Sequence, residues 1–296
     1  MSEIVMKIHF AQFDPRPQGA EANNAIFSLG PVIGIEVTIS ALADRCVVNI
    51  DHHGFNHTSE TPSACERAPG QFDYLPEGET LVFATVRPDA DSVTAMAYFL
   101  NLVENRQSNR DLIKQIGRFD RLGPSAGKPS AVVTAIARKA CDFKLPLKER
   151  VQWVADLLVG ADKSDEIATL NAARDSELEA ARKASELSLR ADDRIACVVS
   201  THRFATNLGY ESAAVVVAMN PYMLVDSKDP AKGTYRKFTV CRYDSHVPCD
   251  LPAALVELQE LEPGWGGRGD IFGSPQGVSS ILPFEKVVEV VSRHLK

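Results

Sequence analysis

The triplet Asp51, His52 and His53 contains three side chains that commonly bind metal ions, and it directly follows an apolar run at residues 45–50. Carboxylates and imidazoles cost free energy when they are buried, unless hydrogen bonds or a cation compensate them. Their position at the end of a predicted buried strand is therefore hard to explain by structure alone. We predict that this triplet contributes to a metal centre.

Asp89 and Asp91 form a second acidic cluster, which follows another apolar run at residues 80–86. The intervening Pro88 stiffens the predicted turn, and Ser92 is expected to cap the following helix. A spacing of two residues in such a turn lets both carboxylates converge, and the helix terminus favours negative charge. Alone, this segment is also explained by a capped turn. Together with the triplet, it predicts a shared metal centre.

Oxygen and imidazole ligands without thiolates suit Mn²⁺, Mg²⁺ or Fe²⁺ better than a structural zinc ion. Two such ions, roughly 3.5–4 Å apart, are a common arrangement for attacking phosphate esters. One ion polarises the phosphoryl oxygens, and the pair lowers the pKa of a bridging water, which then attacks phosphorus in line with the leaving oxygen. We therefore expect Mn²⁺ or Mg²⁺, as two ions.

The elements that must position these clusters alternate between strand-like and helix-like segments. Such alternation predicts an α/β fold with a mostly parallel sheet covered by helices. Ligands bind beyond the carboxyl ends of the strands in these sheets, which is where both acidic clusters fall. Strands are expected at residues 4–10, 32–39, 45–50 and 80–86, and helices at 20–29, 61–68 and 92–102.

The second half of the chain begins with a long segment, residues 164–190, that is rich in Ala, Glu, Arg and Lys and lacks Gly and Pro. This composition predicts a connector helix between two domains. We predict a catalytic, metal-binding domain at residues 1–188 and a smaller α/β, substrate-binding domain at residues 189–296. Further strands are expected at residues 195–200, 213–219 and 235–242, and helices at 253–261 and 284–295.

Composition and charge limit the expected partners. The net charge of −7 over 296 residues argues against tight binding to long nucleic acid, which requires a basic surface, although a short anionic substrate is compatible with it. The six cysteines are scattered without a CxxC pair, which fits a reducing compartment. No apolar run reaches membrane-spanning length and no secretory signal is recognised, so we expect a cytoplasmic protein without a membrane partner.

Three segments of the chain together resemble the DHH phosphoesterases that carry a DHHA1 domain. This family includes nanoRNases, 3′-phosphoadenosine-phosphate phosphatases, cyclic-dinucleotide phosphodiesterases and RecJ-like exonucleases. The C-terminal segment, residues 266–273, follows the family pattern GGHxxAxG, with Arg268 in the place of the histidine. The segments are Asp51-His52-His53-Gly54, Pro88-Asp89-Ala90-Asp91-Ser92 and Gly266-Gly267-Arg268-Gly269-Asp270-Ile271-Phe272-Gly273.

The resemblance implies a Mn²⁺-dependent phosphoesterase with an active site between a DHH and a DHHA1 domain. Its substrate would be a small nucleotide, such as a short oligonucleotide, a dinucleotide or a phosphonucleotide, and a homodimer is left open. Asp51 and His53 would be catalytic. The implied metal ligands are Asp51, His52, Asp89, Asp91 and the further candidate Asp120, and the implied substrate-binding residues are Gly266, Gly267, Arg268 and Gly269. His202 follows a predicted strand of the second domain and is a further candidate to bind a phosphate, with a hydrogen-bonded loop histidine as the alternative.

The chain departs from the family pattern in two ways. In the family, DxD precedes DHH, whereas Asp89 follows the triplet here by more than thirty residues. Either the elements are reordered, or Asp89 and Asp91 occupy the place of a later family aspartate and Asp14 is a reduced remnant of the first motif. Thr85 also stands where the family has a histidine. One metal site is therefore expected either to be weakened or to be completed by another residue, such as His57. The alternatives are a catalytically weakened binding or scaffold protein and a phosphatase for a non-nucleotide phosphate.

Overall fold

The computed structural model describes residues 6–53, 60–71, 80–226, 229–243, 247–267 and 269–296. Contacts divide the chain into an N-terminal unit, Met1–Ala172, and a C-terminal unit, Ala173–Lys296. The division falls within the long helix α8 (Ser164–Lys183), earlier in the chain than the predicted boundary at residue 188. The two units are therefore described one after the other.

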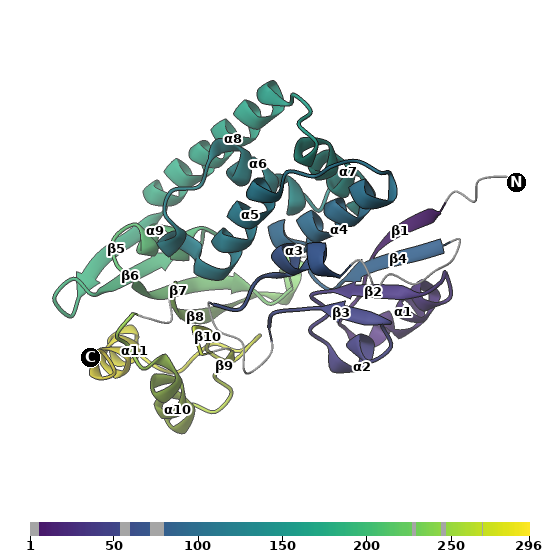
Figure 1. Cartoon of the computed structure of the whole chain (residues 1–296). Coiled ribbons are helices and arrows are strands. Elements are labelled where there is room, and N and C mark those ends of the chain that lie inside the picture. Colours follow the sequence, from purple (N-terminus) through teal and green to yellow (C-terminus); the bar gives the residue numbers. More distant parts are fainter. Residues whose placement is uncertain (1–5, 54–59, 72–79, 227–228, 244–246, 268) are drawn as a thin grey trace, which may run out of the picture. The chain divides into compact units, whose positions relative to one another are not determined.

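The N-terminal unit contains a four-stranded sheet in which every neighbouring pair is parallel (Figure 1). The strand order is β1-β4-β2-β3. A mostly parallel sheet was expected from the alternating pattern, and the structure confirms it. The strands are β1 (Lys7–Gln12), β2 (Val32–Ile35), β3 (Val48–Ile50) and β4 (Thr80–Thr85).

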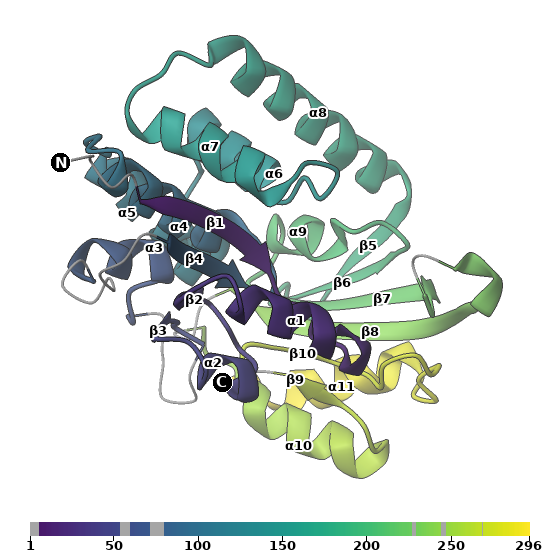
Figure 2. The same ribbon diagram turned by 90° about the vertical axis from the view of Figure 1, so that its right-hand side faces the viewer.

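Helices cover both faces of this sheet (Figure 2). On one face, Leu81 and Phe83 of β4 join the core formed with α4 to α7, and on the other, Val82 and Ala84 face α1 and α2. Successive strand residues point to opposite faces, so burial on both sides explains why these strands read as unbroken apolar runs. The helices are α1 (Ala20–Phe27), α2 (Ser40–Ala43), α3 (Ala64–Arg67), α4 (Ala90–Val103), α5 (Arg110–Leu122), α6 (Ala131–Ala140) and α7 (Leu147–Leu158).

The C-terminal unit contains a six-stranded mixed sheet in the order β5-β6-β7-β8-β10-β9, in which only β6 and β7 pair in parallel. Helices α10 (Leu251–Leu261) and α11 (Phe284–Arg293) pack on one face, and α9 (Ala205–Tyr210) packs on the other. The unit is thus α/β, as predicted. Its strands are β5 (Ser185–Arg190), β6 (Ile195–Ser200), β7 (Val215–Leu224), β8 (Thr234–Arg242), β9 (Gly266–Gly267) and β10 (Ile271–Gly273).

The predicted helix at residues 164–190 is wrong in its last part. Helix α8 ends at Lys183, and Ser185–Arg190 forms β5, which pairs antiparallel with β6 along its whole length. Leu187 and Leu189 alternate with polar residues, a period-two pattern that suits a strand. Pairing with β6 therefore overrides the helix propensity of the segment.

Among the described residues, none of the helices combines the length and the apolar character that crossing a bilayer requires.

Candidate metal centre

Four side chains of the N-terminal unit converge at the carboxyl edge of its sheet. Glu36 follows β2, His52 follows β3, Asp91 lies in the first turn of α4, and Asp120 lies near the end of α5. Their candidate ligand atoms all lie within 4.8 Å of one another. His52 Nε2 is 2.9 Å from Glu36 Oε1, 3.0 Å from Asp120 Oδ2 and 3.8 Å from Asp91 Oδ2. The sequence predicted three of these residues and missed Glu36.

Glu36 combines three unfavourable features. Its side chain is only 4% exposed, its backbone is in the left-handed region with φ of 55°, and its Oε1 is a buried atom without a hydrogen-bond partner among the described residues. A non-glycine residue in this backbone region costs about 1–3 kcal/mol, and a buried carboxylate oxygen that lacks a hydrogen bond adds to that cost. Such an arrangement is typical of a residue that is kept for its chemistry.

The backbone around Glu36 is held by an amide side chain from the neighbouring strand. Asn49 Nδ2 donates to the Val37 carbonyl at 3.0 Å, and Asn49 Oδ1 accepts from the Val37 amide at 3.2 Å. Gly34 leaves space for this contact, because a Cβ there would lie 2.6 Å from Asn49 Oδ1. Together, Gly34 and Asn49 stabilise the turn that directs Glu36 into the cluster.

His52 lies between two carboxylates, but neither close contact has the geometry of a hydrogen bond, and its buried Nε2 has no hydrogen-bond partner among the described residues. Burial alone would lower the pKa of His52, but the carboxylates of Asp120 and Glu36 outweigh it and raise that pKa to about 10. The ligand atoms therefore converge on a common region that favours positive charge. A divalent ion bound there would supply this positive charge in place of a proton on His52.

The pKa values of two carboxylates of the cluster, Glu36 and Asp120, are also raised. Burial raises the pKa of Glu36 well above its usual range, contact with His52 opposes this, and the charges of Asp89, Asp91 and Asp120 raise it further. Burial and the neighbouring aspartates likewise raise the pKa of Asp120, against the effect of His52. This cluster of like charges is costly without a cation, and a bound divalent ion would relieve it.

Asp91 is completely buried and is held by the beginning of α3. Its Oδ1 accepts from Ser63 Oγ at 2.6 Å and from the Cys65 amide at 2.9 Å, while its Oδ2 accepts from the Ala64 amide at 2.7 Å. A carboxylate offers about four acceptor positions, so one position remains, on Oδ2. Because Oδ2 is the atom near His52, it is the candidate ligand atom of Asp91.

Helix α5 approaches α3 closely and thereby brings Asp120 to the cluster. A Cβ at Gly117 would lie 2.4 Å from Ser63 Oγ and 2.4 Å from Glu66 Cγ, so only glycine permits this packing. Asp120 follows Gly117 by three residues and therefore lies on the same face of α5. The adjacent Arg121 donates to Glu66 through Nε at 2.8 Å and Nη2 at 3.1 Å. These contacts fix the end of α5 next to His52.

Asp89 caps a helix, and the prediction that Ser92 is the cap is wrong. Asp89 is the N-cap of α4, and its Oδ1 accepts from the Ser92 amide at 3.0 Å and from Ser92 Oγ at 2.8 Å. Asp89 does not belong to the group of converging ligand atoms, although its charge raises the pKa of both Glu36 and Asp120. That Asp89 binds a metal ion therefore stays a prediction from the sequence.

Asp51 and His53 form a pair beside the cluster. Asp51 Oδ1 lies 2.8 Å from His53 Nδ1 and accepts from the His53 amide at 3.0 Å. Burial would raise the pKa of Asp51, but these bonds to His53 outweigh it and lower that pKa. His53 Nδ1 is also 3.6 Å from Glu36 Oε1, and Glu36, His52 and His53 form a second, overlapping group of candidate ligands. Asp51 therefore positions His53 in this structure.

The predicted substrate-binding residues lie in the C-terminal unit, and those that the structure describes lie at strands that are distant from one another in its sheet. His202 follows β6, and its Nδ1 accepts from the Phe204 amide at 3.2 Å. Gly266 and Gly267 form β9, which is four strand positions away in the sheet order, about 19 Å at the usual strand spacing of ~4.8 Å. Arg268 lies outside the described residues, as does His57.

The glycines of the predicted binding segment have a structural explanation. Gly267 has φ of 148°, and a Cβ at this position would lie 2.5 Å from the Ile271 carbonyl oxygen. Gly273 is equally restricted, since a Cβ there would lie 2.6 Å from the Phe238 carbonyl oxygen. Gly269 lies between β9 and β10 in the chain. Close pairing of β9 with β10 and of β10 with β8 therefore accounts for two of these glycines.

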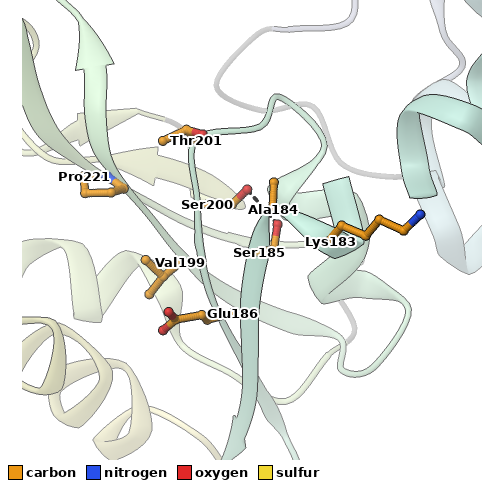
Figure 3. A pocket seen from close by; sticks show the side chains of 8 residues that line it. All are labelled: Lys183, Ala184, Ser185, Glu186, Val199, Ser200, Thr201 and Pro221. Carbon is orange, nitrogen blue, oxygen red and sulfur yellow. Dashed lines mark hydrogen bonds between the residues drawn. The ribbon is translucent and has the colours of Figure 1, made fainter. Parts of the chain in front are cut away.

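A pocket of about 280 Å³ in the C-terminal unit contains none of the candidate metal ligands (Figure 3). Its central hydroxyls are already engaged, because Ser185 Oγ lies 2.6 Å from the Ala181 carbonyl oxygen and 2.7 Å from Ser200 Oγ. We therefore assign it no role in the candidate centre. Its lining consists of Lys183, Ala184, Ser185, Glu186, Val199, Ser200, Thr201 and Pro221.

The donor set of the cluster fits a hard divalent cation. Three carboxylates and one imidazole suit Mn²⁺ or Mg²⁺, and the buried atoms without partners on Glu36 and His52 are the ones that such an ion would satisfy. The nitrogen His52 Nε2 has one lone pair and binds one ion. The two overlapping groups that share His52 therefore represent alternatives for one ion, and the second predicted ion remains a prediction.

No protein-family model matches the chain, and no curated protein matches its sequence. The resemblance to the DHH phosphoesterases therefore remains a prediction from three short segments. The functional interpretation rests on the geometry of the N-terminal unit.

Proposed function

We propose that the protein is a divalent-metal-dependent phosphoesterase that hydrolyses a small nucleotide. The observation that carries the proposal is the contact between two buried atoms, Glu36 Oε1 and His52 Nε2, which lie 2.9 Å apart and have no hydrogen-bond partners within the described part of the chain. Asp91 and Asp120 complete a hard ligand set around them. A Mn²⁺ or Mg²⁺ ion bound there would polarise a phosphoryl oxygen and lower the pKa of a bound water.

The chain itself contributes ligand placement and a group that can move a proton. The first turn of α3 fixes Asp91, and Asn49 fixes the turn that carries Glu36. Since Asp51 engages His53 Nδ1, Nε2 is the nitrogen of His53 that can exchange a proton with water or with the leaving oxygen. In this proposal, His53 and Asp51 are the catalytic pair beside the ion.

Two observations favour a small nucleotide over a long nucleic acid. The net charge of −7 opposes binding of an extended polyanion, whereas a short one requires only local positive charge. The resemblance to the DHH phosphoesterases supports short oligonucleotides, dinucleotides or phosphonucleotides as the class to test. A phosphatase for a non-nucleotide phosphate would use the same centre with a different substrate preference.

A catalytically weakened binding protein is the second candidate, and Thr85 favours it. This residue stands where the family pattern has a histidine, and its Oγ1 is buried without a hydrogen-bond partner among the described residues. A threonine is a poorer metal ligand than an imidazole, so a second ion would be held weakly or be absent. Such a protein would bind Mn²⁺ and a nucleotide without turnover.

The experiment that tests the proposal starts from metal-free protein. Mn²⁺ should raise its melting temperature and should support hydrolysis of bis-(p-nitrophenyl) phosphate and of a panel of linear and cyclic dinucleotides. His52→Ala should abolish both effects, while His294→Ala, which alters a histidine paired with Glu257 in the C-terminal unit, should leave them unchanged. Absence of any Mn²⁺-dependent stabilisation and hydrolysis in the unaltered protein would refute the proposal. Stabilisation without hydrolysis would favour the binding protein.

A further inference from the structure

We propose that Arg67 holds an anionic oxygen of the substrate beside the candidate metal centre. The inference rests on the proposed function and assigns the substrate-binding cation to the N-terminal unit. Arg67 is the last residue of α3, and its Nη1 donates to the carbonyl oxygen of Asp51. This carbonyl belongs to the peptide bond that joins Asp51 to His52. The guanidinium is therefore anchored one peptide away from a candidate metal ligand.

The charge of Arg67 is not neutralised by its partner. Its one hydrogen bond among the described residues goes to a backbone carbonyl, and it forms no ion pair there. A guanidinium has five N–H donors, so four remain, and none of its nitrogens is a buried atom without a partner. The remaining donors are consequently open to solvent and to a ligand.

Two other arginines of this unit contrast with Arg67. Arg121 forms a two-point contact with Glu66, and Arg16 donates to Asp14 through Nε at 2.8 Å and Nη2 at 2.6 Å. Each of these guanidinium groups is matched by a carboxylate. Arg67 is instead held by a neutral backbone carbonyl, which fixes the position of its guanidinium without neutralising its charge.

The charge of the centre explains why such a cation is needed. Glu36, Asp51, Asp89, Asp91 and Asp120 carry up to five negative charges at this edge, against two or four positive charges from one or two divalent ions. A phosphate ester would therefore approach a region that is still negative. An arginine is suited to offset the remaining negative charge, because its planar guanidinium can donate two parallel hydrogen bonds to phosphate oxygens.

The test measures anion binding separately from turnover. Inorganic phosphate is titrated into the Mn²⁺-loaded protein, and Mn²⁺ binding is measured in parallel, both by calorimetry. Arg67→Gln should weaken phosphate binding roughly 10- to 100-fold, as expected for a lost charge-assisted contact, while Mn²⁺ affinity changes by less than about threefold. Arg67→Lys, which keeps the charge and loses the planar guanidinium, should be intermediate. Lys114→Gln removes the same charge from an exposed position of α5 and should change neither constant.

Three results would overturn the inference. Phosphate affinity of Arg67→Gln within about twofold of the unaltered protein, or absence of phosphate binding in the unaltered protein, would remove Arg67 from the substrate site. An equal loss of Mn²⁺ and phosphate affinity would instead show that Arg67 only holds the Asp51–His52 segment. Phosphate binding that depends on Arg67 but occurs without hydrolysis would keep the inference and refute the phosphoesterase.

Discussion

Two buried glutamates, one in each unit, show how differently the chain treats the same side chain. Glu262 is 6% exposed, and its Oε2 accepts from Trp265 Nε1 and from Ser280 Oγ, both at 2.7 Å, while its Oε1 accepts from the Ile281 amide at 2.6 Å. Glu36 is as deeply buried, yet its Oε1 has no hydrogen-bond partner among the described residues. The first carboxylate is satisfied by hydrogen bonds, whereas Oε1 of the second lies 2.9 Å from His52 Nε2 without the geometry of a hydrogen bond.

The backbones of the two residues differ in the same sense. Glu262 has φ of −148°, an ordinary extended conformation, whereas Glu36 has φ of 55°. At Glu36, backbone strain coincides with a carboxylate oxygen that has no hydrogen-bond partner among the described residues, whereas Glu262 has an unstrained backbone and a hydrogen-bonded carboxylate. Burial alone therefore does not single out a candidate functional carboxylate, whereas burial combined with backbone strain and a missing hydrogen bond does.

Replacement of Glu262 should have the largest effect on stability. Glu262→Ala leaves an indole N–H, a hydroxyl and a backbone amide without their acceptor, which should lower the free energy of unfolding of the C-terminal unit by about 3–5 kcal/mol. Hydrogen exchange of the β8 amides measures this change, and Mn²⁺ affinity should not move. Glu260→Ala, at an exposed position of α10, is the control. A loss below about 1 kcal/mol would remove the contrast with Glu36.

Replacement of Glu36 should produce the opposite pattern. Glu36→Gln removes a candidate ligand and should lower Mn²⁺ affinity by more than about 100-fold, which corresponds to about 2.8 kcal/mol. The metal-free protein should change little in stability, because the substitution removes a buried carboxylate oxygen that lacks a hydrogen bond but also the attraction of that carboxylate to His52. Glu21→Gln, an exposed position of α1, is the matched control. Unchanged Mn²⁺ affinity would show that Glu36 is not a ligand.

The same two residues show which parts of the site could be predicted from the sequence. His52 and Asp91 were found because each follows an apolar run, and a parallel sheet brings the ends of such runs to one edge. Glu36 was missed because residues 32–39 were interpreted as one strand. Its position depends on a left-handed turn and on an amide side chain from the neighbouring strand, neither of which has a local sequence signal.

The C-terminal unit was harder to predict, because its sheet is built from pairings between distant segments. His202 and the Gly266–Gly267 pair were both predicted to bind substrate, and the order of six strands, which separates them in the sheet, was not visible in the sequence. The segment Ser185–Arg190 has helix-favouring neighbours and becomes a strand only by pairing with β6. Composition predicted the α/β class, whereas strand order and register depend on long-range contacts that a single sequence does not display.

Replacement of Ser63 should have an intermediate effect on both quantities that separate the two glutamates. Ser63→Ala removes one of the three hydrogen bonds to Asp91, so the free energy of unfolding should fall by about 1–2 kcal/mol and Mn²⁺ affinity by about tenfold. Urea denaturation and calorimetry measure the two changes. Ser28→Ala, an exposed hydroxyl bonded to the Asn24 carbonyl, is the control. A change in stability without a change in affinity would mean that Asp91 is structural, like Glu262.

Replacement of Asp89 should have the smallest effect and decides to which class of carboxylate it belongs. Asp89→Ala removes the N-cap of α4 and should cost about 1 kcal/mol of stability, whereas Asp89→Asn retains a capping oxygen and should cost little. Neither variant should change Mn²⁺ affinity by more than about threefold, since Asp89 lies outside the converging ligand atoms. A tenfold loss, or a fall from two bound ions to one in Asp89→Asn, would place Asp89 with Glu36 as a metal ligand. That result would restore the role that the sequence alone predicted for it.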